Sequence, residues 1–159
     1  MMRSSVRGFS LVELLVSVAI LGLLASIAMP VVELTQKRQR EANLREALRS
    51  IRHAIDAYKD ASDHHRIAVD NGASGYPPSL LDLSSGVTDL NSPDGPKLYF
   101  IRRIPRDPMN GDISVDAIKS WGLRSFASPY DAPRSGNDVF DVYSTSTEVG
   151  LNGIPYSEW

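Results

Sequence analysis

The residues with the clearest chemical potential lie near the start of the chain, at Gly8, Phe9 and Glu13. Glu13 is a carboxylate at the head of an apolar run, residues 14–32, that holds 19 residues and no charge. As a helix this run would rise about 28 Å, close to the hydrocarbon thickness of a bilayer. Because a charge is costly to bring into lipid, a carboxylate at this place indicates a functional site. We expect a membrane helix, residues 9–32, in which Glu13 does more than anchor.

Residues 7–15, RGFSLVELL, with the apolar run behind them closely resemble the class III signal of type IV pilins and type II secretion pseudopilins. In that family a prepilin peptidase cuts on the cytoplasmic side after the glycine, here Gly8, and N-methylates the new first residue, here Phe9. The resemblance implies a leader peptide, residues 1–8. It also implies a single-pass protein of the inner membrane whose head faces the periplasm, an orientation that basic residues on both sides of the span do not decide.

Cleavage would leave a cationic amine on Phe9, one helical turn from the Glu13 carboxylate. In a helical bundle Glu13 can meet the amine of a neighbouring subunit, and pairing removes both charges from lipid together. We therefore expect Glu13 to set the axial stagger of subunits in a helical filament.

Two further positions of the apolar run bear on assembly. Gly22 and Ser26 form a small-x-x-x-small face that suits close helix packing. Pro30 removes the amide that would bond the Ser26 carbonyl, so we expect the helix to kink or loosen there. The resemblance implies that residues 22–30 are the compliant segment in a filament.

Two plainer readings of this segment exist. One is an ordinary secretory signal cut after the small-x-small sequence at residues 26–28. The other is a signal anchor in which Glu13 is incidental. Glu13 argues against the first, because it would lie inside the apolar core of the signal.

Residues 33–61 read as an amphipathic helical stem. Its apolar residues fall on one stripe at helical spacing: Leu44, Ala47, Leu48, Ile51, Ile55 and Tyr58. The other face is charged, with the pairs Glu41–Arg45 and Arg52–Asp56 four residues apart. We expect the stripe to pack against the sheet of the head; a coiled coil is disfavoured because the pattern lasts only two to three turns.

The head, residues 62–159, is rich in loops, since nine of the ten prolines and nine of the eleven glycines lie beyond residue 70. Ser79 should cap a short helical turn, and residues 121–126 and 138–144 alternate like antiparallel strands. The expected fold is α+β, a long N-terminal helix packed on a small antiparallel sheet. Residues 99–108 resemble the tyrosine, basic, proline-x-aspartate-proline segment of the major, G-type pseudopilins, and residues 158–159 their acidic-tryptophan end.

Calcium is the one cofactor that the resemblance implies, because major pseudopilins bind it in an acidic C-terminal loop. Here the equivalent loop, residues 145–153, has one carboxylate, Glu148, which would need backbone carbonyls beside it. We expect no cofactor to be required. A second acidic stretch, residues 107–116, lacks the full EF-hand pattern and reads as a solvated turn. His53, His64 and His65 read as exposed polar residues rather than metal ligands.

Charge and motifs exclude several classes of function. The stem has seven basic and five acidic residues, giving +2, and the head eight basic and thirteen acidic, giving −5. This acidic head does not suggest a nucleic-acid binder. No phosphate-binding loop, dinucleotide fingerprint or serine-nucleophile motif occurs, and there is no cysteine. We do not expect an enzyme.

The resemblance therefore implies a structural subunit of the type II secretion pseudopilus, which drives protein export through an outer-membrane secretin. Its partners would be copies of itself, other pseudopilins, the inner-membrane assembly platform and the prepilin peptidase. One alternative is a type IV pilin, major or minor, for adhesion, motility or DNA uptake. Another is a periplasmic binding or enzymatic domain on a borrowed anchor, against which the motif-free head argues.

Overall fold

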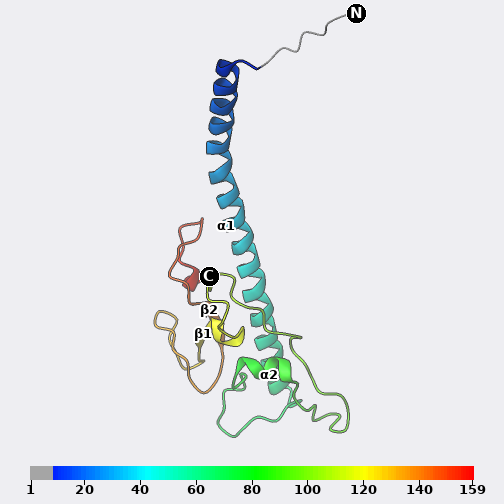
Figure 1. Cartoon of the computed structure of the whole chain (residues 1–159). Helices are drawn as coiled ribbons and strands as arrows, with labels where there is room; N and C mark the ends of the chain where they lie inside the picture. The colour runs from blue at the N-terminus through cyan, green and yellow to red at the C-terminus, as the bar shows by residue number, and fades with distance from the viewer. Residues whose placement is uncertain (1–8) are drawn as a thin grey trace, which may run out of the picture. The chain divides into compact units, whose positions relative to one another are not determined.

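The computed structural model describes residues 9–159, apart from the side chains of residues 27–30. In chain order its elements are α1 (Leu11–Asp63), α2 (Leu80–Ser85), η1 (Ile118–Ser120), β1 (Trp121–Arg124), β2 (Asp141–Ser144) and η2 (Tyr156–Glu158) (Figure 1). One long helix and a small antiparallel sheet confirm the α+β class. The chain divides into two compact units, Met1–Gln39 and Arg40–Trp159.

Helix α1 has 53 residues and is not interrupted between Gly22 and Pro30. A proline removes one hydrogen bond of the ladder while the turns on either side keep theirs, so a single chain can stay helical there. The extended form of this segment in a filament stays a prediction. The helix ends at Asp63, two residues beyond the expected Ala61, and the chain leaves it through His65, a left-handed residue at φ 55°. The bonds Arg66 N–H to Ala61 O and His65 N–H to Ser62 O complete a Schellman motif.

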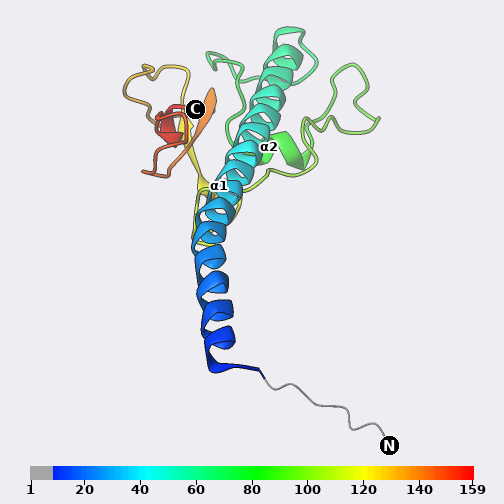
Figure 2. The ribbon, with the colours of Figure 1, turned by 90° about the horizontal axis from the view of Figure 1, so that it is seen from above.

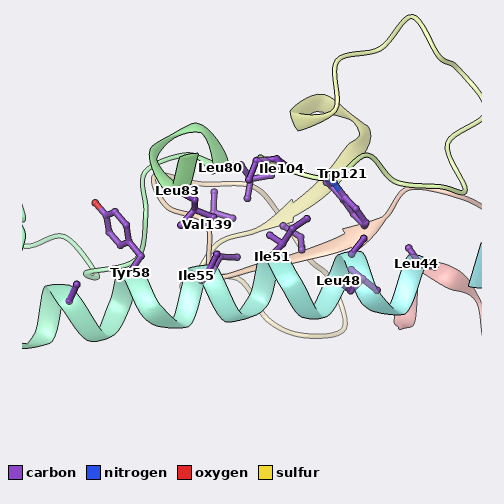
Figure 3. Packing of buried hydrophobic residues seen from close by; sticks show 14 of the residues in the cluster. Leu44, Leu48, Ile51, Ile55, Tyr58, Leu80, Leu83, Ile104, Trp121 and Val139 are labelled. Atoms are coloured by element: carbon purple, nitrogen blue, oxygen red, sulfur yellow. The ribbon is translucent and has the colours of Figure 1, made fainter. Parts of the chain in front are cut away.

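The apolar stripe of the stem is buried as expected, with no member more than 7% exposed. Figure 3 shows its side chains pointing from one face of α1 towards Leu80 and Leu83 of α2, Ile104, Trp121 and Val139. The prediction that the stripe packs against the sheet of the head is therefore only partly right. The sheet supplies Trp121 and Val142, while α2 and loops supply much of the rest, because each strand is only four residues long.

The sheet pairs β1 with β2 in antiparallel register, from Trp121 opposite Ser144 to Arg124 opposite Asp141. Strand β1 is shorter than expected because the next amides leave the ladder. The Phe126 N–H donates to the Asp138 carboxylate rather than to a strand. Ser79 caps helix α2 as expected, and its N–H donates to the Asp82 carboxylate at 2.9 Å in a capping box.

Candidate functional site

The N-terminal part of α1 exposes its apolar side chains. The most apolar 18-residue window of the helix has a mean hydropathy of 2.5, and none of it is buried. Every large apolar side chain described between Leu11 and Val32 is more than half exposed. The helix is long and apolar enough to cross a membrane, by length and composition. This surface therefore needs a partner outside the chain, either lipid or neighbouring helices.

Glu13 lies in the first turn of α1, where a carboxylate is favoured by the exposed amides. Its side chain is exposed, and within residues 9–159 no ion pair includes it. Ser17 bonds the Glu13 main-chain oxygen, not its carboxylate, at 2.7 Å. Phe9 is 75% exposed ahead of the helix. Gly8, on the other side of the expected cleavage point, lies outside the described residues.

Gly22 faces open space: a Cβ built on it would meet nothing within 4 Å. Its own chain thus sets no requirement for a glycine there. Small size at this position gives room only to something that approaches from outside, which suits the expected helix packing. Of Pro30 the structure describes the backbone alone, so its expected part in assembly stays a prediction.

In the head, an unexpected carboxylate joins α1 to the C-terminal segment, residues 145–159. Glu41 was expected on the solvated face of the stem but is only 4% exposed. Its Oε1 accepts hydrogen bonds from the Leu151 amide at 2.7 Å and the Tyr156 hydroxyl at 3.0 Å. Figure 2 shows this segment, in red, beside α1. The pairing with Arg45 occurs, but at a loose 3.9 Å.

Two arginines of α1 hold the end of the segment. The Arg45 guanidinium lies 4.2 Å from the ring centroid of Trp159. Arg52 Nη2 donates to the Trp159 main-chain oxygen at 2.8 Å, and its Nε donates to Asp141 at 2.8 Å. The expected Arg52–Asp56 pair is therefore wrong: the guanidinium turns to the sheet, where one side chain can bond both β2 and Trp159.

A second buried carboxylate, Asp107, lies in the proline-x-aspartate-proline segment. It is fully buried and accepts hydrogen bonds from Ser144 Oγ at 2.6 Å and the Met109 amide at 2.8 Å. Its own amide donates to Ser120 Oγ at 3.0 Å. The prediction of a solvated turn is wrong at Asp107 and right at Asp112, which is exposed. Asp107 fastens this loop to the end of β2.

The oxygens of the C-terminal loop do not fit a calcium ion, which takes six to eight oxygen ligands. Glu148 is exposed, and within residues 9–159 no group of three or more acidic, histidine or cysteine side chains is arranged to hold a metal. Ser146 Oγ accepts the Glu148 amide and Asn152 Oδ1 accepts the Ile154 amide, so both are already engaged within the loop. Calcium at Glu148 stays an untested prediction.

The three histidines are exposed, as expected; His64 Nδ1 lies 3.2 Å from the Asp60 carboxylate. The parts played by Glu41, Asp107 and Arg52 were not predicted from the sequence. For Glu41 a signal existed, because it precedes Leu44 by three residues and so extends the buried stripe. The β2 partners of Asp107 and Arg52, which are Ser144 and Asp141, lie 37 and 89 residues further along the chain, and no local pattern indicates them.

Comparison with known proteins agrees with this arrangement. A family model described as "Prokaryotic N-terminal methylation motif" matches residues 3–29. The chain is 31% identical to type II secretion system core protein G of Klebsiella michiganensis over 87% of its own length and 94% of the relative's. The protein of the same name from Vibrio cholerae is 31% identical over 96% of this chain and 90% of its own. No solved structure is significantly similar.

An exposed apolar helix with Glu13 at its head, followed by a small α+β head, defines a pilin-like subunit. Within that class the chain belongs to the family of type II secretion system core protein G, which confirms the resemblance to the major pseudopilins. The alternative of a type IV pilin is not favoured.

Proposed function

We propose that this chain is a structural subunit of the type II secretion pseudopilus and not an enzyme. It would be cut after Gly8, methylated on Phe9 and assembled in the inner membrane with its head in the periplasm. Its partners would be copies of itself, other pseudopilins and the inner-membrane platform. The assembled pseudopilus would drive protein export through the secretin.

One observation carries the proposal: Glu13 stands on an exposed apolar helix, and within residues 9–159 it has no ion-pair partner. An unpaired carboxylate at the edge of lipid is costly, so a second chain that brings a cation lowers the free energy. The amine of a neighbour's Phe9 supplies that cation only at one axial stagger. Assembly and register then follow from the same pair.

The test replaces Glu13 by Val. Membrane insertion and cleavage should survive, since the apolar run lengthens and the Gly8–Phe9 bond is untouched, whereas filament yield and crosslinking between subunits should be lost. Glu13→Asp should assemble poorly because its shorter side chain leaves the amine out of reach. Ser17→Val is the matched control: it also makes the span more apolar but keeps the carboxylate. Wild-type filament levels in Glu13→Val would defeat the proposal.

A further inference from the structure

One carboxylate oxygen of α1 accepts two hydrogen bonds from the C-terminal segment. Glu41 Oε1 receives the Leu151 N–H and the Tyr156 O–H, from residues 110 and 115 positions further along the chain. Tyr156 is fully buried and Glu41 nearly so, and Tyr156 packs edge-on against Trp159 with ring centroids 5.0 Å apart. The bond between Tyr156 and Glu41 therefore joins distant parts of the chain in a place that excludes water.

This carboxylate is compensated without a metal. A carboxylate removed from water needs donors or a cation to offset its lost hydration. Here an amide and a hydroxyl occupy Oε1, and the Arg45 guanidinium lies 3.9 Å from Oε2. Hydrogen bonds to an ionised group are stronger than neutral ones, so this set is sufficient to hold the segment.

The charges in this contact are arranged in the reverse way to those in a calcium site. In a calcium loop, oxygens of the loop converge on a cation. Here donors of the loop, Leu151 N–H and Tyr156 O–H, converge on an anion that belongs to the helix. We infer that Glu41 closes the C-terminal segment in place of a divalent cation, so that the head of this chain folds without calcium.

The experiment measures thermal unfolding of the full-length chain in detergent micelles by tryptophan emission, since both tryptophans lie in the head. Glu41→Ala leaves the buried Tyr156 hydroxyl and the Leu151 amide without an acceptor and should lower the Tm by about 5 to 10 °C. Glu41→Gln keeps an acceptor oxygen and should recover most of that loss. Glu46→Ala, at an exposed glutamate of the same helix, is the matched control and should change the Tm by no more than about 2 °C.

Calcium chloride and EDTA are then compared on the wild-type chain and on Glu41→Ala. Equal Tm values with either addition, in both proteins, support the inference. A wild-type Tm that rises with calcium and falls with EDTA would overturn it, as would a Glu41→Ala Tm equal to that of Glu46→Ala. None of these readouts involves filaments or secretion, so a failure of the proposed function would leave them standing.

Discussion

At the scale of single residues, three sets of polar contacts, two buried and one part-buried, hold the head together, and each joins segments far apart in the chain. Glu41 receives the C-terminal segment, Asp107 receives the end of β2, and Arg52 bonds both Asp141 and Trp159. When a buried polar group loses its hydrogen-bond partner, the free energy of its desolvation is no longer offset. The loss of such a contact therefore destabilises the fold by more than the free energy of the hydrogen bond alone. Substitutions at these residues should therefore act on stability before they act on assembly.

Asp107→Ala should lower the free energy of unfolding by about 2 to 4 kcal/mol, because the Ser144 hydroxyl and the Met109 amide lose a buried acceptor. Denaturant unfolding of the full chain measures this. Asp112→Ala is the control, from the same loop but at an exposed residue. If the two variants unfold at the same denaturant concentration, Asp107 does not fasten the loop.

Tyr156 should make the head sensitive to alkaline pH. Burial, together with its hydrogen bond to Glu41 and the charge of that carboxylate, raises the pKa of Tyr156 from 10.0 to about 12. Because Tyr156 has the higher pKa in the folded state, its contribution to stability is fully present below pH 10. It is lost as the pH rises towards 12, since the tyrosine ionises first in the unfolded chain. The lost stability should be about 1 to 2 kcal/mol. Tyr156→Phe should lack this part of the pH dependence; an identical alkaline slope in variant and wild type would contradict it.

At the scale of elements, the sequence predicted the features that repeat at helical spacing or carry a local motif. The stripe of the stem repeats at helical spacing, and Ser79 marks the start of α2, so both were found. The packing partner of the stripe was predicted only in part, because loops without a repeating pattern cover most of the buried face of α1. The left-handed residue His65 at the end of α1 was also not predicted. It is held by main-chain hydrogen bonds, which residues of other types form equally well.

The stem stripe itself is tested by Ile51→Asp. Ile51 has no exposed surface, so an aspartate there is an unpaired charge in the core and should cost about 3 to 5 kcal/mol. Ile113→Asp makes the same change at a side chain that is 87% exposed and should unfold like the wild type. A Tm for Ile51→Asp that matches the control would show that the stripe faces solvent.

At the scale of the whole molecule, the two compact units have opposite requirements. The second unit, Arg40–Trp159, contains the core of the head and buries Glu41 and Asp107 within itself. The N-terminal unit exposes a continuous apolar surface that nothing in the described chain covers. The head of such a subunit has its core within the same chain, while the N-terminal helix needs lipid or neighbouring helices. Stability and assembly should therefore respond to different substitutions.

Processing decides whether the apolar helix stays with the mature protein. Cleavage after Gly8 should give a chain that begins at N-methylated Phe9 and retains residues 14–32, because the cut precedes the span. Mass spectrometry of the N-terminal peptide, from protein extracted out of membranes, measures this directly. Gly8→Val should leave the leader attached, while the head keeps its Tm because the change lies outside the unit that contains its core. A mature chain that begins at Met29 would instead show an ordinary secretory signal, cut after residues 26–28, and a head released without the helix that carries Glu13.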